Sequence, residues 1–253
     1  MTLRKSIYNA IVLAWLFGSP VAVSASGDDF KSANQLYDAG KFAEAAAAYE
    51  KIEPKTAHVY YNLGNAWFRQ DKLGLAILNY ARARQLAPRD PDILANLKFA
   101  QQRLGVDEIN TPPHATERLF RSAIDSCTIN EWSAGELTGL WLLALAIGIW
   151  IYLPKARTAL QVVALAGFVV FGVSTFALGY QVINDHAAPQ AIAVTGEAEA
   201  RFAPVPDSTI HFRLAEGTRV TIREDRGQWL FVERADGQQG WVKSEAIGRL
   251  INF

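Results

Sequence analysis

The residue types that carry covalent or metal chemistry are few and scattered in this sequence. Cys127 is the single cysteine, which excludes an intrachain disulfide and any cysteine-rich zinc or iron–sulfur site. A cysteine nucleophile needs a histidine as its base, and the four histidines lie in different segments. No acid–base pair of carboxylates and no phosphate-binding motif stands out. We therefore expect a protein that is not an enzyme, with no catalytic residue, cofactor or metal.

Amide side chains suited to binding a peptide recur in the predicted helices near residues 60–97. Asn62 and Asn96 fall one repeat length apart. Asn65 and Arg69 follow one and two turns after Tyr61 on one helix. Side-chain amides both donate and accept hydrogen bonds, as an extended peptide requires. A peptide groove is one interpretation of these four polar residues, and ordinary solvated surface is the other.

Two tryptophans near the C-terminus, Trp229 and Trp241, are candidates for a second binding surface. Aromatic side chains line the grooves in which SH3-type domains hold peptides. The alternative is that the indoles pack the core of a small domain, which needs every large apolar residue. We favour the packing role for Trp241.

Two uncharged stretches, residues 137–154 and 158–184, determine how the regions before and after them are placed relative to a membrane. They are separated only by Lys155-Ala156-Arg157, and each approaches or exceeds the roughly 20 residues that span a bilayer as a helix. A loop this short predicts a helical hairpin, with both flanking regions on one side of the membrane. A buried hairpin in a soluble protein is the alternative. Neither stretch carries an ionisable residue, which favours an anchor over a transporter.

The charges around this hairpin predict its orientation. Lys155 and Arg157 occupy the tip, and basic residues in short loops prefer the cytoplasm. Residues 1–25 independently read as a signal peptide, with a basic start, an apolar centre and small residues before the cleavage point. An uncleaved anchor is the alternative, and it exports residue 28 onward just as well. Both observations place the flanking regions outside the cytoplasm.

Residues 57–90 carry a helical repeat pattern. Leu63-Gly64, Trp67 and Tyr80 are spaced as in the tetratricopeptide repeat, which this segment resembles, and Pro88 ends the second helix. A weaker, shortened copy precedes it, and residues 91–104 begin a third unit that we expect to act as a cap. The resemblance implies an all-α solenoid with a concave groove for a peptide or protein.

Short β-rich runs replace the helical pattern from residue 191. The turns Asp225-Arg226-Gly227 and Asp236-Gly237 separate predicted strands, and five or six such strands predict a small barrel. Trp229 and the run Gly240-Trp241-Val242 resemble a bacterial SH3 domain. That resemblance implies binding of peptides or, in some relatives, of peptidoglycan.

The order of these modules resembles the aerotolerance-operon proteins of the BatE type. That resemblance implies a scaffold beside a MoxR-type ATPase and von Willebrand A-domain membrane proteins. We therefore expect a multidomain membrane protein with an all-α solenoid, two transmembrane helices and a small all-β SH3-like barrel. Its expected partners are proteins or peptides, the lipid bilayer and, as an alternative, peptidoglycan. The balanced charge, 25 basic against 25 acidic residues, gives no indication of nucleic acid. The expected segments are 1–25 signal peptide, 28–104 tetratricopeptide repeats, 105–131 linker and juxtamembrane helix, 132–153 and 158–183 transmembrane helices, and 190–250 SH3-like domain.

Overall fold

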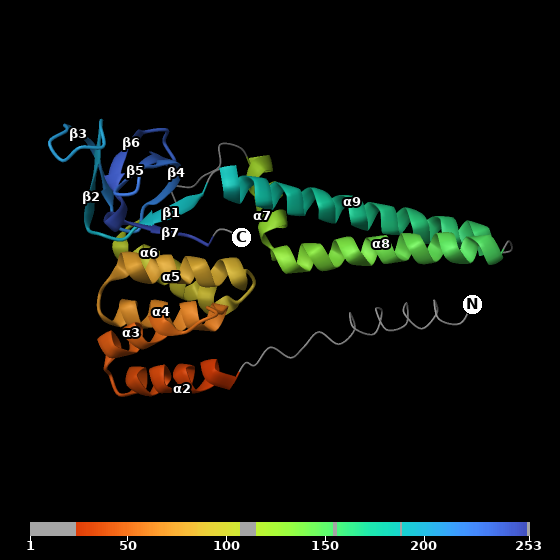
Figure 1. The fold of residues 1–253 in the computed structure, drawn as a ribbon, viewed down its shortest axis with the longest axis horizontal. Helices are drawn as coiled ribbons and strands as arrows, with labels where there is room; N and C mark the ends of the chain where they lie inside the picture. The colour runs from red at the N-terminus through yellow and green to blue at the C-terminus, as the bar shows by residue number, and fades with distance from the viewer. Residues whose placement is uncertain (1–23, 107–114, 154–155, 188, 252–253) are drawn as a thin grey trace, which may run out of the picture.

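The computed structural model describes residues 24–106, 115–153, 156–187 and 189–251. The predicted signal peptide lies almost wholly outside the described residues, as do Lys155 of the hairpin tip and most of the linker before residue 115. The described chain forms a helical region, a long helical hairpin and a C-terminal sheet. The sheet lies at one end of the stacked helices, and the hairpin projects away from both (Figure 1).

The helical region contains five helices that pack each on the next along the chain. They are α2 (Ser24–Asp38), α3 (Phe42–Lys51), α4 (Ala57–Arg69), α5 (Leu73–Leu86) and α6 (Pro91–Leu104). Gly64 lets α4 and α5 approach closely, because a Cβ there would lie 2.7 Å from the ring of Tyr80. Asp90 caps α6 by accepting from the amides of Asp92 and Ile93, and Gly105 ends it in the left-handed conformation.

The helical hairpin consists of α8 (Ile129–Tyr152) and α9 (Arg157–Ala187). Small residues allow the close approach, since a Cβ on Gly139 would lie 2.5 Å from the Phe171 nitrogen and 2.8 Å from the Gly167 oxygen. Both helices are long and apolar enough to cross a membrane. Only 11% of the apolar window of α8 and 17% of that of α9 are buried. A soluble hairpin would leave this surface in water, so lipid is the environment that it suits.

The small residues of α9 lie on two faces of the helix. Gly167, Ser174 and Ala177 are buried against α8. A Cβ added to Gly172 or Gly179 would meet no atom within 4 Å. The first set therefore serves the hairpin itself.

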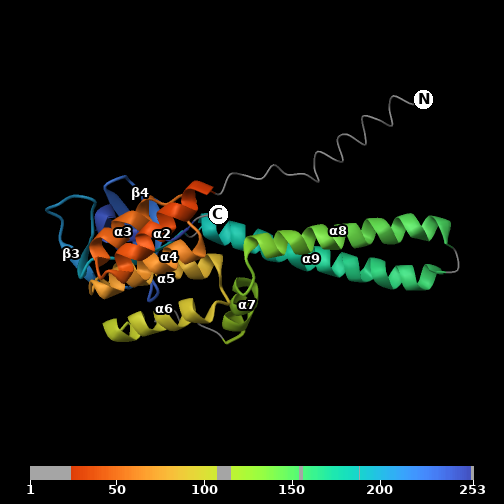
Figure 2. The ribbon, with the colours of Figure 1, turned by 90° about the horizontal axis from the view of Figure 1, so that it is seen from below.

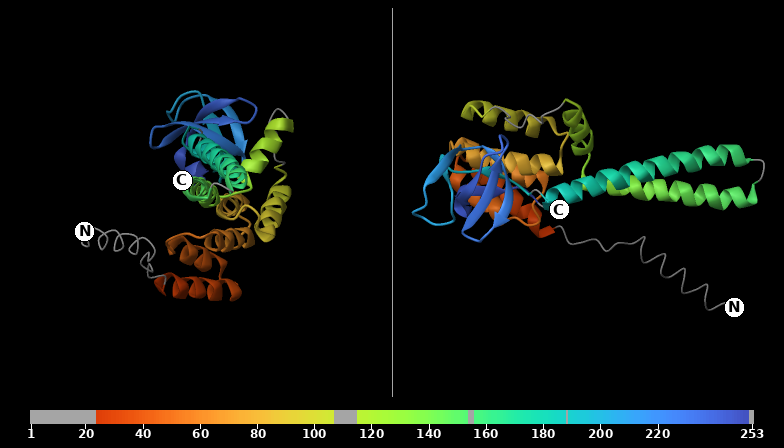
Figure 3. Two further views of the ribbon diagram at one scale, coloured as in Figure 1. Left: turned by 90° about the vertical axis from the view of Figure 1, so that its right-hand side faces the viewer. Right: turned by 90° about the horizontal axis from the view of Figure 1, so that it is seen from above.

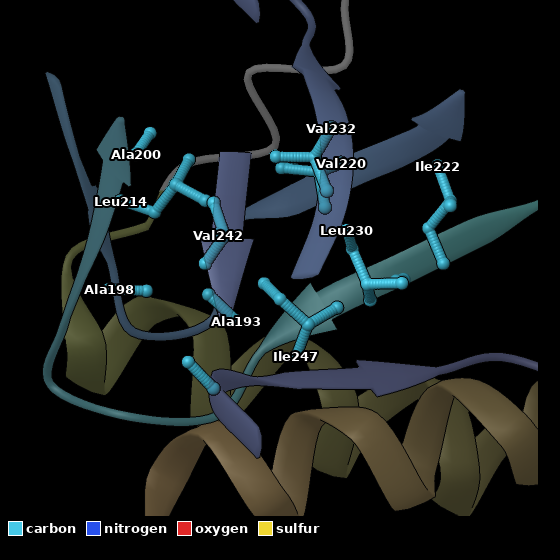
Figure 4. Close-up of a cluster of buried hydrophobic side chains, with 12 residues drawn as sticks. Ala193, Ala198, Ala200, Leu214, Val220, Ile222, Leu230, Val232, Val242 and Ile247 are labelled. Atoms are coloured by element: carbon cyan, nitrogen blue, oxygen red, sulfur yellow. The ribbon is translucent and has the colours of Figure 1, made fainter. Parts of the chain in front are cut away.

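The C-terminal region is one antiparallel sheet with the strand order β3-β2-β6-β5-β4-β1-β7. Its elements are β1 (Gln190–Ala193), β2 (Glu197–Arg201), β3 (Ile210–Ala215), β4 (Arg219–Asp225), β5 (Trp229–Arg234), β6 (Gln239–Lys243), the 3-10 turn η2 (Ser244–Ala246) and β7 (Ile247–Arg249). Alternate residues of these strands point into one apolar cluster above the helices (Figure 4). Gly227 and Gly237 have positive φ at the two predicted turns. The strands predicted at residues 198–202, 219–223, 229–233 and 240–243 are present as β2, β4, β5 and β6, and β1, β3 and β7 are additional.

The sheet is docked on the helical region through α5. Ile77 and Leu78 of α5 share a buried cluster with Ile192 of β1 and Leu250 at the C-terminus. Gly248 of β7 makes this approach possible, because a Cβ there would lie 2.2 Å from a methyl carbon of Leu78. Figure 1 shows the sheet directly above α5, with α4, α3 and α2 stacked successively farther away.

Polar contacts reinforce this docking at three places along α5. The amide of Gly74 donates to Glu216 Oε1 at 2.6 Å. Arg82 donates through two nitrogens to the carbonyl of Arg249, at 3.1 and 2.6 Å. Gln85 and the backbone of Ile251 exchange two hydrogen bonds, 3.2 and 3.0 Å long. Segments separated by the whole hairpin thus form one head, and this requires both ends of the hairpin to lie on the same side.

Candidate binding surfaces

The predicted groove residue Asn62 lies in a hydrogen-bond cluster between helices. Its amide nitrogen donates to Asn34 Oδ1 at 3.1 Å, and the hydroxyl of Tyr49 donates to the same oxygen at 2.5 Å. These residues come from α2, α3 and α4, so the cluster ties three helices together. Burial raises the pKa of Tyr49 to about 12, which keeps the hydroxyl protonated and able to donate.

An equivalent cluster joins α4, α5 and α6. Asn65 Oδ1 accepts from the hydroxyl of Tyr80 at 2.7 Å and from the amide nitrogen of Asn96 at 3.1 Å. The amide nitrogen of Asn96 also donates to the hydroxyl of Tyr61 at 2.9 Å. Burial raises the pKa of Tyr80 as well. The structure therefore brings Asn65 and Asn96 together, and part of the hydrogen-bonding capacity of both side chains is used inside the protein.

These amides retain capacity for a ligand. An asparagine side chain offers two donor hydrogens and an acceptor oxygen. Asn62 donates one hydrogen bond to Asn34, and the side-chain oxygen of Asn65 accepts hydrogen bonds from Tyr80 and Asn96. All three predicted asparagines are only half-buried. Arg69 is exposed, with its guanidinium 4.3 Å from the ring centre of Phe42. The four predicted residues thus line helices α4 and α6, whereas the sheet docks through α5.

Trp229 and Trp241 are both buried, with 8% and 7% of their surfaces exposed. Leu230 and Val242, their neighbours along β5 and β6, point into the core, so the tryptophans belong to the opposite face of the sheet. There the ring of Trp241 lies 5.1 Å from that of Phe231, and Arg226 covers it at 4.6 Å. As the side chains lie, neither indole offers much surface to a peptide.

A hollow on the SH3-like module was not predicted from the sequence. It has a volume of about 300 Å³ and lies between β2 and β6. Its lining carries both signs of charge and a small apolar floor, from Glu197, Glu199, Arg201, Pro206, Val242, Lys243 and Ala246. Arg201 is held there by Glu199 and by the carbonyl of Ser208. The alternation Glu197-Ala-Glu199-Ala-Arg201 was the available signal, because it places three charges on one side of a strand.

Such a hollow suits a ligand that carries both amino and carboxylate groups. The charged lining residues are already paired, Glu199 with Arg201, Glu197 with Arg213 and Lys243 with Glu245, so a charged ligand would bind by exchanging these ion pairs. Cell-wall peptides have this mixed charge, and so do ordinary peptide termini. Neither Trp229 nor Trp241 lines the hollow, although Trp241 is the cross-strand partner of Arg201.

Comparison with known proteins agrees with the architecture of this module. Residues 194–248 match the family described as bacterial SH3 domain. This range covers β2 to β6 and most of β7, while β1 and Leu250, which contact α5, lie outside it. The chain as a whole matches no curated protein. The C-terminal module is therefore similar to bacterial SH3 domains.

Proposed function

We propose that this protein is a non-catalytic membrane scaffold that binds protein partners through a two-module head in the bacterial periplasm. The observation that carries the proposal is the docking of α5 against β1 and β7, which joins the two modules on one side of the hairpin. The predicted signal peptide and the basic hairpin tip support the periplasmic side. The SH3-like match supports a binding role for the C-terminal module.

The helical region acts in this proposal as a tetratricopeptide array with an open groove. The helix order, the close contact of Gly64 with Tyr80 and the sequential packing support that assignment. Helices α2, α4 and α6 are the first helices of the successive units and would line the groove. The β module occupies α5, a second helix, and so leaves the groove side available to a partner.

Arg69 gives the sharpest test of the groove, because Asn62 and Asn96 also hold the helices together. Arg69→Ala removes an exposed cation and should weaken partner capture from detergent-solubilised membranes, while the helical melting curve changes little. Lys51→Ala, at an exposed position on α3, is the matched control. Equal capture by both variants would contradict the groove assignment.

The partners proposed are von Willebrand A-domain membrane proteins and a MoxR-type ATPase of an aerotolerance complex. The order of modules along the chain supports this choice, through its resemblance to BatE-type proteins. The full chain, purified under mild detergent with its hairpin intact, should recover a von Willebrand A-domain protein by affinity capture. Recovery without any such protein would contradict the aerotolerance assignment.

Peptidoglycan binding is the second candidate function, and the hollow between β2 and β6 favours it. The test uses purified cell wall and the full chain in detergent. Lys243→Ala changes an exposed lining residue and should reduce retention on the wall, whereas Lys51→Ala should not. Absence of any retention of the unmodified chain would remove this candidate and leave the scaffold proposal intact.

A further inference from the structure

Helix α7 (Ala115–Asp125) lies at the base of the hairpin, beside the end of α9 that is nearest the head (Figures 1 and 2). Its Phe120 ring packs edge-on against Tyr180, with ring centres 5.3 Å apart, and against Phe176 at 6.1 Å. The spacing of apolar residues in 116–126 suits a short helix at the membrane surface, and it suits a soluble helix packed on the helical region equally well. The described contacts of its aromatic side chain are instead with the hairpin.

The C-terminal end of α7 is fixed to both helices of the hairpin. The carbonyl of Ile124 accepts from Trp132 Nε1 at 3.1 Å and from Gln181 Nε2 at 3.0 Å. Gln181 also donates to the carbonyl of Cys127 at 3.1 Å. Ile124 itself is buried. Because these bonds satisfy carbonyls at the helix end, α7 has a defined place relative to α8 and α9.

The hairpin geometry gives the depth of that place in a bilayer. Thr175 donates to Glu136 at 3.0 Å, which aligns these two positions on neighbouring helices. From Arg157 to Thr175 the helix rises by about 27 Å, close to the roughly 30 Å of a hydrocarbon core. With the tip at one boundary, Thr175 and Glu136 therefore lie near the other. The α7 contacts begin at Phe176, immediately beyond it.

At this level α7 presents an apolar surface to the outside. Leu119 is 73% exposed and Phe120 is 41% exposed. The helix has apolar residues on one side and charged positions on the other, the pattern of helices that lie in the membrane interface. The lipid-facing surface of α9 adjoins it at Phe176, which is itself exposed. The apolar surface of α7 thus continues the surface that the hairpin offers to lipid.

We propose that α7 lies in the outer headgroup layer, with Leu119 and Phe120 inserted toward the acyl chains of the bilayer that the hairpin spans. Arg118 and Arg121 are offset by Glu117 and Asp125, so the helix sequence has no net charge. Its attachment therefore rests on apolar contact and needs no anionic lipid. Such an attachment fixes the distance of the head from the membrane, whatever partner the head binds.

The test places single cysteines in the full chain, in a Cys127→Ser background, reconstituted in phosphatidylcholine nanodiscs. An environment-sensitive fluorophore is attached at Leu119→Cys, at Phe168→Cys and at Lys98→Cys. Phe168 is exposed in the middle of α9 and Lys98 is exposed on α6, so they report lipid and water. We expect spin-labelled lipids to quench the Leu119 label at least about threefold more than the Lys98 label, as interfacial insertion requires.

Three results would overturn the proposal. Quenching at Leu119 equal to that at Lys98 would place α7 in water. Quenching that appears only when anionic lipid is added would contradict apolar attachment. An unquenched label at Phe168 would show that the hairpin is not inserted.

A second variant keeps the test independent of the label at Leu119. With the fluorophore at Ala123→Cys, which is exposed on the next turn, Leu119→Glu should abolish quenching. The same substitution should leave quenching at Phe168 unchanged. Unaltered quenching at Ala123 would also count against the proposal.

Discussion

Gln85 offers a direct way to separate the two modules of the head without altering either core. Its side-chain amide pairs with the backbone of Ile251 through two part-buried hydrogen bonds. Gln85→Ala removes the donor to the Ile251 carbonyl and the acceptor from the Ile251 amide in one substitution. Residues 85 and 251 belong to different modules, so the effect should cross between them.

The expected size follows from the two hydrogen bonds. A buried hydrogen bond contributes about 0.5–1.5 kcal/mol, so the loss should weaken the docking by about 1–3 kcal/mol. Local opening of the docked strand should become about 5- to 150-fold more frequent, since each 1.4 kcal/mol is a factor of ten. Gln85→Glu should also weaken the docking: the carboxylate can still accept from the Ile251 amide, but it cannot donate to the Ile251 carbonyl.

Hydrogen exchange measured by mass spectrometry on the detergent-solubilised full chain is the assay. Exchange should accelerate in peptides that cover residues 190–194 and 247–251, while peptides from β5 and β6 stay protected. Gln102→Ala, at an exposed position on α6, is the matched control and should change neither. Exchange in residues 247–251 that stays within about twofold of the unmodified protein would refute the docking described for α5.

Three further outcomes are expected. Gly139→Leu should open the hairpin and lower its thermal stability, because a Cβ there meets backbone atoms of α9. Gly148→Leu is the control and should be tolerated, since a Cβ at that site meets no atom within 4 Å. Equal melting temperatures of the two variants would contradict the packing of α8 on α9. Trp241→Ala should destabilise the SH3-like module by about 3–5 kcal/mol in denaturant unfolding, and a change below about 1 kcal/mol would contradict its packing role. A hydrogen bond from Arg234 lowers the pKa of Asp236 from 3.8 to about 2, so the carboxylate stabilises the folded state fully above pH 3.8 and this contribution is lost as pH falls through about 2. Asp236→Asn should therefore flatten the acid limb of the stability curve, and an unchanged limb would count against that pairing.

The long elements of this fold could be predicted from the sequence because each has a strong local signal. Apolar length predicts α8 and α9, and Pro88 and the Gly64–Tyr80 spacing predict the ends and packing of α4 and α5. The turns at Gly227 and Gly237 were predicted for the same reason, since few residues other than glycine adopt their backbone conformation.

The strands β1 and β7 were missed because they lack the alternation of a half-exposed strand. Ala191, Ile192 and Ala193 of β1 are all buried. Ala191 and Ala193 pack in the core of the sheet, and Ile192 packs on the opposite face against α5. A run that is apolar on both sides carries no period of two. Strand β7 has only three residues, too few to show a pattern.

The sequence of α5 carries a signal that the helix is covered on more than one side. Residues Leu73 to Ala83 are buried almost all round the helix, and a helix without a polar side is covered on every side. The sequence does not show what covers α5. Gly248 and Gly74 are recognised as close-contact positions only when α5 and the sheet, which are distant in sequence, pack together. The groove residues show the same limit, since Asn65 could be recognised as a hydrogen-bonding group but not as a partner of Tyr80.

The central claim is that the helical region and the SH3-like module form one head on one side of the membrane. A disulfide between Gly74→Cys and Glu216→Cys, in a Cys127→Ser background, tests it most directly. A Cβ on residue 74 would lie 2.6 Å from Glu216 Cγ, so two cysteines there fall within bonding reach.

The full chain in membranes should form this disulfide on mild oxidation, seen as a shift on a non-reducing gel that reducing agent reverses. A control pair, Glu216→Cys with Asp38→Cys, should stay reduced, because α2 lies at the far end of the helical stack (Figure 3). We predict near-complete cross-linking of the first pair alone. Failure of that pair, or equal cross-linking of both pairs, would contradict the single head.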